Sequence, residues 1–295
     1  MKNKFYNYIQ FQKRLSPHSV IAYQNDVNQF QQYIHYQYGL TNFNEVKYTF
    51  VRSWIVSLME KGLSAKSIHR KISSIKALYK FLRKEGLIDV NPVEKVNLPK
   101  VSHDLPVFLT ENQTNDLFDR VEFFDDYYGK RDKTILLLFY STGIRLSELI
   151  SLNESDVDIC GQAIKVLGKR KKQRIIPITK ELEIILEEFI ALKKLRFLNV
   201  EKDESYLFLT DKGKKLYPNY VYRIVKKYLG VVSTNKKKSP HVLRHTFATH
   251  MLDNGAELNA VKELLGHANL SATQVYTHNT VEKLKSIYKQ AHPKA

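Results

Sequence analysis

Apolar side chains in the first 95 residues recur at three- and four-residue steps, which is the period of amphipathic helices. Ser16 and Pro17 form an N-cap followed by proline at the first helical position. The apolar positions after this cap are Val20, Ile21, Tyr23, Val27, Phe30 and Ile34. Ser64 is a second cap, and Gly86 ends the helix that Ser64 opens. The pattern therefore predicts an all-helical domain over residues 1–91.

The helical period is lost after this domain. Residues 92–106 contain proline and show no clear period, which predicts an interdomain linker. Thr110 then begins a capping box with Gln113, and this box opens a second domain at residues 107–295. Helical patterns resume at Lys180 after a stretch with β-prone runs at residues 157–159, 163–167 and 174–178. We therefore expect a mainly α-helical chain with a small antiparallel β-sheet in the second domain.

The composition is that of a chain with a buried core. Of the 295 residues 43% are hydrophobic, yet no apolar run approaches the roughly 20 residues of a membrane span. The apolar run at residues 135–140 is expected to be a core helix segment. The N-terminus lacks the apolar stretch of a secretion signal. Cys160 is alone, which excludes an internal disulfide and a cysteine metal cluster. We therefore expect a cytoplasmic protein that does not span a membrane.

The charge balance points to a polyanionic partner. The net charge is +17, from 47 basic and 30 acidic residues, and this favours binding to nucleic acid or to an acidic membrane surface. Residues 1–97 carry +9 and the remainder carries +8, so both domains are basic. Two basic domains joined by a linker would suit a clamp around a duplex. The alternative is a soluble basic protein without such a partner.

The helix that follows Ser64 has a basic face. Its members are Lys66, Arg70, Lys71, Lys76, Lys80, Arg83 and Lys84. A stripe of this kind is usually a solvated face. Few acidic residues lie near it, however, so contact with phosphate is an equal alternative.

Two segments of the second domain combine cations with a nearby core. Arg145 follows the apolar run, where an arginine needs an anion, and Glu148 could be that partner in an internal salt bridge. Residues 168–174, Gly-Lys-Arg-Lys-Lys-Gln-Arg, place five cations at a predicted hairpin tip. They favour either a phosphate backbone or a solvated turn. The spacing of a P-loop is missing, so ATP binding is not implied.

Two further segments contain histidine. His241 and Arg244 are three residues apart and share a helix face. His241 and His245 have a spacing that can bind metal, but neither the glutamate of HExxH nor another nearby ligand completes a site. We therefore expect no metal, and His245 is interpreted as a packing or supporting residue. Tyr276 follows His267 after eight residues, and as one of 18 tyrosines it is a core residue by default.

Together these segments supply the side chains that phosphoryl transfer needs without a metal or another cofactor. A phenol has a pKa near 10 in water, and neighbouring arginines would favour its phenolate. Two planar guanidiniums match the oxygens of a phosphoryl transition state. Lysine and histidine can move the protons. A phosphotyrosine ester preserves bond energy, so strands could be rejoined without ATP.

The order Arg, Lys, His-x-x-Arg, His, Tyr resembles the tyrosine recombinase (phage integrase) family, and most closely its Xer recombinases. The strings that carry the resemblance are TGIRLSEL at 142–149, VLGKRKKQRIIPI at 166–178, HVLRHTFATHML at 241–252, LLGHANLSATQVYTH at 264–278 and HPKA at 292–295. The opening LSPHSVIAYQNDVNQF is similar to the family's core-binding domain, so the resemblance covers nearly the whole chain. It implies a SAM-like helical N-terminal domain and a catalytic domain that form a C-shaped clamp on double-stranded DNA.

The resemblance also implies a role for each matching residue. Tyr276 would attack the scissile phosphate and give a 3′-phosphotyrosyl link with a free 5′-hydroxyl. The phosphate oxygens would be held by Arg145 and Arg244, with Glu148 as their support. The remaining roles would be proton donation to the leaving oxygen by Lys169, acid–base action on the nucleophile by His241 and a hydrogen bond to the phosphate by His267. Arg-Lys-Lys follows Lys169 where Xer proteins more often carry Gly and Asn, so Lys171 and Lys172 compete for its role.

The function implied by the resemblance is site-specific recombination that resolves chromosome dimers at cell division. The protein would act as a homo- or hetero-tetramer with a related recombinase on two DNA sites. The last helix, at about residues 281–290, would dock on a neighbouring subunit, and a septal DNA translocase could activate the complex. The alternatives are an integrase of a mobile element, a catalytically inactive DNA-binding protein and a type IB topoisomerase.

Overall fold

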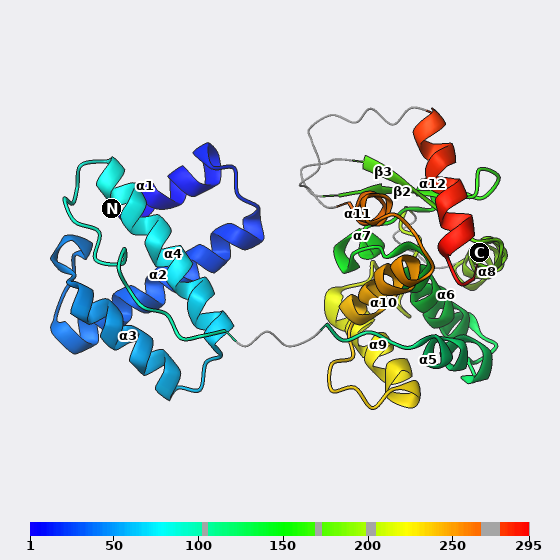
Figure 1. Cartoon of the computed structure of the whole chain (residues 1–295), viewed down its shortest axis with the longest axis horizontal. Coiled ribbons are helices and arrows are strands. Elements are labelled where there is room, and N and C mark those ends of the chain that lie inside the picture. The colour runs from blue at the N-terminus through cyan, green and yellow to red at the C-terminus, as the bar shows by residue number, and fades with distance from the viewer. Residues whose placement is uncertain (102–105, 169–172, 199–204, 267–277, 295) are drawn as a thin grey trace. The chain divides into compact units, whose positions relative to one another are not determined.

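The computed structural model describes residues 1–101, 106–168, 173–198, 205–266 and 278–294. The chain forms two compact units, Met1–Asp104 and Leu105–Ala295 (Figure 1). Val93 and Val96, which fall in the predicted linker, are buried in the hydrophobic core of the first unit. The first unit therefore continues beyond residue 91, and the bounds of the linker remain a prediction.

The described part of the first unit is built from helices around one core. Its elements are α1 (Lys2–Asn7), η1 (Tyr8–Gln12), α2 (Pro17–Tyr38), η2 (Phe43–Glu45), α3 (Tyr48–Glu60) and α4 (Ala65–Lys84), with η1 a π-helical and η2 a 3₁₀-helical turn. Both predicted N-caps are confirmed, because the Ser16 and Ser64 hydroxyls each accept the amide hydrogen three residues on, at 3.3 Å. In the core, the rings of Phe30 and Trp54 lie 4.9 Å apart.

One lysine of the predicted basic face of α4 is buried and not exposed to solvent or to a ligand. Lys71 is buried, and its Nζ donates to Asp26 Oδ1 at 3.1 Å. Arg70 forms a bidentate ion pair with the same carboxylate, at 2.5 and 2.9 Å, and Ser74 donates to it at 2.8 Å. Lys71 therefore compensates a buried aspartate of α2 and belongs to neither a solvated nor a phosphate-binding face. The residues of the basic face that are exposed are Lys66, Arg70, Lys80, Arg83 and Lys84.

The second unit is mainly helical with a small sheet. Its elements are α5 (Glu111–Asn115), η3 (Asp116–Arg120), α6 (Tyr127–Thr142), α7 (Leu146–Ile150), η4 (Glu154–Asp156), β1 (Val157–Asp158), β2 (Ala163–Leu167), β3 (Gln173–Pro177), α8 (Lys180–Arg196), α9 (Pro218–Val232), α10 (Pro240–Asp253), α11 (Leu258–Leu265) and α12 (His278–Ala291). The predicted capping box of Thr110 and Gln113 opens α5. The strands are antiparallel in the order β1-β2-β3, so the predicted fold class is confirmed. Within the described residues, no helix is long and apolar enough to cross a membrane.

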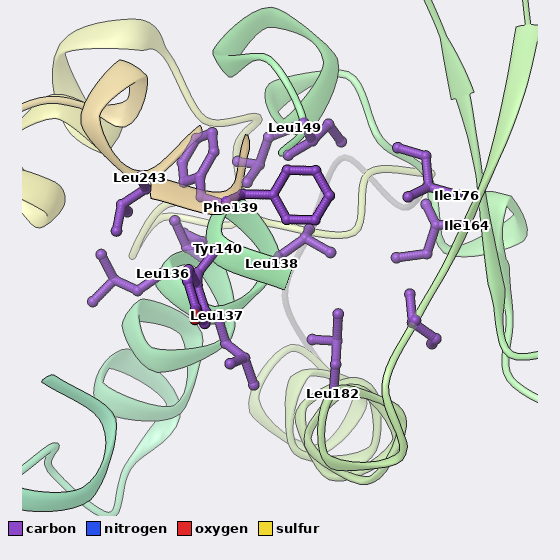
Figure 2. Packing of buried hydrophobic residues seen from close by; sticks show 14 of the residues in the cluster. Leu136, Leu137, Leu138, Phe139, Tyr140, Leu149, Ile164, Ile176, Leu182 and Leu243 are labelled. Atoms are coloured by element: carbon purple, nitrogen blue, oxygen red, sulfur yellow. The ribbon is translucent and has the colours of Figure 1, made fainter. Parts of the chain in front are cut away.

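Helix α6 runs through the core of the second unit and packs against α8 and α10. Its residues 135–140 are at most 1% exposed, which confirms the predicted core segment. Alternate residues of β2 are buried, so one face of the sheet is turned to this core. Figure 2 shows Ile164 and Ile176 pointing from the sheet toward Leu138 of α6 and Leu182 of α8. The sheet and α6 thereby form a rigid base for the residues that follow α6.

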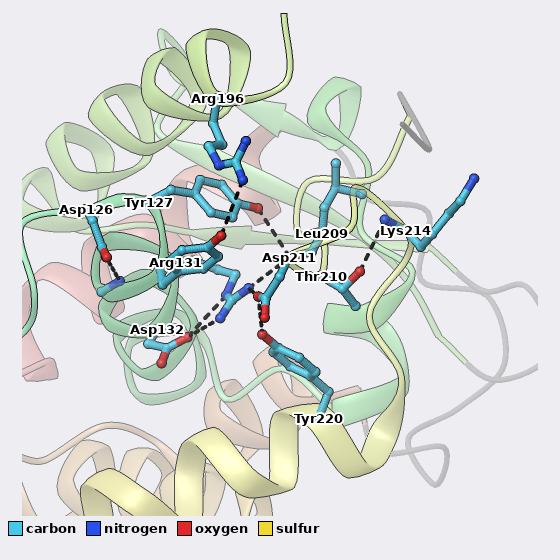
Figure 3. Close-up of polar contacts among 12 residues, drawn as sticks. Asp126, Tyr127, Arg131, Asp132, Arg196, Leu209, Thr210, Asp211, Lys214 and Tyr220 are labelled. Carbon is cyan, nitrogen blue, oxygen red and sulfur yellow. Dashed lines mark hydrogen bonds and ion pairs between the residues drawn. The ribbon is translucent and has the colours of Figure 1, made fainter. Parts of the chain in front are cut away.

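A buried arginine ties α6 to the segment before α9. Arg131 is 3% exposed, and its guanidinium lies between Asp132, at 3.0 Å, and Asp211, at 2.9 Å (Figure 3). It also stacks on Tyr220 at 4.9 Å from the ring centre, and the Tyr220 hydroxyl donates to Asp211 at 2.6 Å. The network joins α6 to a part of the chain about 80 residues later, the segment at Asp211 and the start of α9.

The described part of α12 packs on its own unit in this single chain. Its neighbours are α10, α11 and β3. Tyr288 is buried, and its hydroxyl donates to the carbonyl of Ser141 at 2.8 Å. The docking of this helix on a neighbouring subunit remains a prediction.

Candidate active site

The first site residue lies at the break between α6 and α7. Gly143 ends α6 in the left-handed conformation, with φ of +57°. A Cβ here would lie 2.5 Å from Phe247 Cδ1 and 2.6 Å from Leu265 Cδ2, so the turn needs glycine. The turn places Arg145 directly before α7, with 25% of its side chain exposed. The Arg145 side chain therefore lies at the edge of the core, where part of it is open to solvent.

Glu148 holds Arg145 in this position. One carboxylate oxygen accepts the backbone N–H of Arg145 at 2.8 Å, and the other accepts Nη1 of the same residue at 2.8 Å. The Glu148 side chain is only 3% exposed. Burial opposes ionisation, but hydrogen bonds and charge from Arg174 and Arg145 outweigh it and lower the pKa of Glu148 to about 2. The internal salt bridge that the sequence suggested is confirmed.

Arg174 is a residue of this site to which the sequence analysis gave no role of its own. Its predicted place in a strand at residues 174–178 is confirmed, since it lies inside β3, but its side chain is only 4% exposed and does not belong with the cations of the hairpin tip. Its Nη1 and Nη2 donate to the two oxygens of Glu148 at 2.9 Å each. The grouping of Arg174 with the cations that bind a phosphate backbone or form a solvated turn is therefore wrong. The signal that could have found it is the two-residue step from Arg174 to the buried Ile176, which indicates an inward-facing strand position.

Three arginines converge on the C-terminal end of α11. The donor and acceptor pairs are Arg174 Nε with Leu264 O at 2.8 Å, Arg244 Nη2 with Leu265 O at 2.7 Å and Arg145 Nη2 with Gly266 O at 2.8 Å. The last carbonyls of a helix lack partners within it and carry the negative end of its dipole. The three guanidiniums supply both the missing donors and the compensating charge.

Arg244 is buried more deeply than Arg145. It belongs to α10 and is 9% exposed, and its Nη1 donates to the carbonyl of Gly143. Burial, followed by the charges of Arg145 and Arg174, lowers its pKa to about 10, so it stays protonated at neutral pH. Within the described part of the cluster, the positive charges of three guanidiniums are therefore balanced by the negative charge of only one carboxylate, that of Glu148. An anion would offset the excess positive charge.

His241 lies one turn before Arg244 on α10 and is exposed. Partial burial and the charges of Arg244 and His245 lower the pKa of its imidazole below the ordinary value of 6.5. The ring is therefore mainly neutral at pH 7 and can accept a proton. His245 is also exposed, so the packing alternative for it is wrong, while the supporting alternative remains a prediction. The packed histidine of α10 is His250, which is buried with one ring nitrogen 2.9 Å from the carbonyl oxygen of Leu109.

An open pocket of about 430 Å³ lies beside Arg145. Its lining includes Glu148, Lys165, Gly168 and Gln173, so it extends from α7 to the base of the β2–β3 hairpin. Among the described residues, no three His, Cys, Asp or Glu side chains are grouped to hold a metal ion. The arrangement suits an anionic group bound by guanidiniums.

Three of the predicted site residues, Lys169, His267 and Tyr276, lie outside the described residues. Two of them are next in sequence to parts of the site. Gly168 lines the pocket, and Gly266 accepts a hydrogen bond from an arginine. Of the predicted set, the structure brings together Arg145, Arg244 and His241, and it adds Arg174.

Two family models match the chain. The model of the phage integrase family matches residues 107–283, and that of the phage integrase N-terminal SAM-like domain matches residues 3–86. A curated relative, tyrosine recombinase XerC of Chlorobaculum parvum, is 38% identical over 99% of this chain and 94% of its own length. Tyrosine recombinase XerC of Bacillus subtilis is 36% identical over 99% of this chain and 95% of its own length.

Solved structures show the same fold. The Tn1549 transposon integrase in complex with circular intermediate DNA has a TM-score of 0.72 at 22% identity, covering 95% of this chain and 97% of that one. XerH bound to a palindromic difH substrate has a TM-score of 0.70 at 21% identity, covering 91% and 78%. The chain therefore belongs to the phage integrase family. Within it, the chain is a tyrosine site-specific recombinase similar to XerC over nearly its whole length.

Proposed function

We propose that this recombinase cleaves and rejoins DNA through a covalent bond to Tyr276 and that it resolves chromosome dimers. The observation that carries the proposal is the convergence of three guanidiniums on one helix end, where a single carboxylate, Glu148, pairs with two of them. The excess charge suits the non-bridging oxygens of a phosphodiester. The names of the curated relatives, tyrosine recombinase XerC, support the same chemistry and the same role.

In this proposal Arg145 and Arg244 bind the scissile phosphate. Arg145 is partly exposed, while Glu148 fixes its orientation, so its guanidinium is available on the solvent side. Both side chains are planar donors that stabilise the charge developing on the phosphate oxygens. Removing either of them lowers the cleavage rate by about 10²–10³, the scale of one lost oxyanion donor.

The protons move through the residues around this pair. Tyr276 attacks phosphorus, and its phenolic proton passes to His241, whose lowered pKa keeps it neutral and able to accept. Lys169, with Lys171 or Lys172 able to share the task, protonates the departing 5′ oxygen, and His267 donates a hydrogen bond to the phosphate. The products are a 3′-phosphotyrosyl link and a free 5′-hydroxyl. Attack by the 5′-hydroxyl of another strand reverses these steps and releases the tyrosine.

The proposal extends to the assembly on DNA. The two basic units clamp double-stranded DNA, and four subunits, identical or shared with a related recombinase, join two DNA sites. A septal DNA translocase activates the complex in the cytoplasm. DNA binding is supported by the net charge of +17 and by the DNA complexes among the similar solved structures.

A suicide substrate tests the proposed chemistry. The substrate is a duplex that carries the chromosome-dimer resolution site of the source genome, with a nick beside the cleavage position. Cleavage releases a short fragment that diffuses away, so the covalent adduct accumulates and is seen as a shifted band under denaturing conditions. We expect an adduct with the wild-type chain and none with Tyr276→Phe.

The control is Tyr222→Phe, which removes a partly exposed phenol of α9 outside the site. It should form the adduct at the wild-type rate. The mechanism would be wrong if the wild-type chain formed no adduct or if Tyr276→Phe still formed one.

A further inference from the structure

The last two carbonyls of α11, those of Leu264 and Leu265, and the carbonyl of its C-cap Gly266 each accept a hydrogen bond from a different arginine. At Gly266, which has φ of +66°, the Arg174 side chain leaves little space beside the backbone. A Cβ on Gly266 would lie 3.1 Å from Nη1 and 3.2 Å from Cδ of Arg174. The guanidinium of Arg174 therefore packs directly against the end of the helix that it caps.

The arginines differ in how far their side chains are exposed to solvent and in how many of their donors already bond to the protein. The Arg174 side chain is 4% exposed. Its Nε donates a hydrogen bond to the carbonyl of Leu264, and both of its terminal nitrogens donate to the carboxylate of Glu148. Arg145 is 25% exposed and keeps a side open to solvent. The two guanidiniums share one oxygen of Glu148, which accepts from Arg145 Nη1 at 2.8 Å and from Arg174 Nη1 at 2.9 Å. Arg174 is thus committed to protein acceptors.

In the proposed function, binding of a phosphate would engage the other two arginines. Arg145 and Arg244 each donate to a carbonyl at the α11 end, and these donors would turn toward phosphate oxygens, in whole or in part. The chain leaves α11 at Gly266 and continues to His267 and Tyr276. The helix end that precedes the nucleophile would therefore lose two of its three side-chain donors when they are needed for the substrate.

We propose that Arg174 is a positioning residue for the cleavage reaction. It keeps the end of α11 in place through Leu264, and it keeps Glu148 oriented, and therefore Arg145, while Arg145 and Arg244 engage the phosphate. Arg174 touches neither DNA nor the reacting atoms. The inference rests on the proposed function and adds to it a link between β3, α7 and α11.

Arg174→Lys is the informative substitution, since it retains the charge but cannot donate in three fixed directions. The matched control is Arg131→Lys, which alters an arginine of the same unit that is 3% exposed and ion-paired with Asp132 and Asp211, and that contacts none of the described site residues. Both variants should melt at a lower temperature than the wild type. On the nicked suicide duplex, at a temperature where all the proteins are folded, only Arg174→Lys should slow adduct formation, by about 10-fold or more. Its affinity for the duplex should stay within about twofold of the wild type, because Arg174 does not touch DNA.

The double variant with Glu148→Gln separates positioning from a general loss of packing. Because Arg174 acts partly through Glu148, the rate losses of Arg174→Lys and Glu148→Gln should combine to less than their product. The inference is overturned if Arg174→Lys reacts at the wild-type rate, if Arg131→Lys slows the reaction equally or if the two losses multiply. A wild-type chain that forms no adduct would instead overturn the proposed function.

Discussion

Replacing Glu148 with glutamine probes the charge balance of the arginine cluster. The substitution keeps the shape of the side chain but removes the charge that pairs with Arg145 and Arg174. The pKa of Glu148 is lowered from 4.5 to about 2, which favours its charged form by about 3 kcal/mol at about 1.4 kcal/mol per pKa unit. We expect Glu148→Gln to reduce the free energy of unfolding of the second unit by about 3 kcal/mol at pH 7.

The size of this loss should depend on pH in one direction. A depressed pKa in the folded state gives stabilisation that is complete above the unfolded pKa of 4.5 and disappears as the pH falls through about 2. The difference in unfolding free energy between the wild type and Glu148→Gln should therefore be largest near pH 7. At about pH 3 it should be less than half as large.

The position of the single tryptophan makes the assay specific. Trp54 is buried in the first unit, so its fluorescence during urea unfolding reports that unit, while far-UV circular dichroism reports both. Glu148→Gln should leave the Trp54 transition in place and shift the remaining circular dichroism transition to lower urea. A stability difference that is the same at pH 7 and pH 3, or a Trp54 transition that shifts equally, would refute the reasoning.

Two further predictions concern proton transfer and the turn before Arg145. Adduct formation should accelerate as the pH rises through a value below 6.5, because His241 accepts a proton only when neutral. His241→Gln should lose this limb of the pH–rate profile, and an unchanged profile would rule His241 out as the acceptor. Gly143→Ala should lower the melting temperature of the second unit through a loss of about 1–3 kcal/mol, since its φ is positive and a Cβ meets two side chains within 2.6 Å. Gly230→Ala in α9, where a Cβ meets nothing within 4 Å, should be neutral or stabilising, and equal melting temperatures for the two variants would contradict the argument.

Local spacing was sufficient to predict much of this molecule. The caps at Ser16 and Ser64 and the buried run at 135–140 depend on near neighbours in the chain, and so does the pairing of Arg145 with Glu148. These features need no knowledge of distant contacts, since a helix brings residues three and four positions apart onto one face.

The predictions that failed concern side chains whose partners lie far away in sequence. Arg174 takes one of its acceptors from a residue 90 positions later, and Lys71 pairs with Asp26, 45 positions earlier. Helix α10 has buried residues around much of its circumference, so its period could not distinguish the exposed His245 from the packed His250. The choice of Tyr276 among 18 tyrosines depended on the order of the motifs and not on any local pattern.

The use of peptide oxygens as acceptors makes the arginine cluster unequally sensitive to mutation. A peptide oxygen is present whichever side chain a residue carries, so substitutions at Leu264 or Leu265 cannot delete an acceptor while α11 stays folded. Each donor, in contrast, is a side chain that a single codon change can remove. Inactivating alleles at this site should therefore concentrate at the three arginines, while the two leucines should accept other apolar residues that fill the same volume.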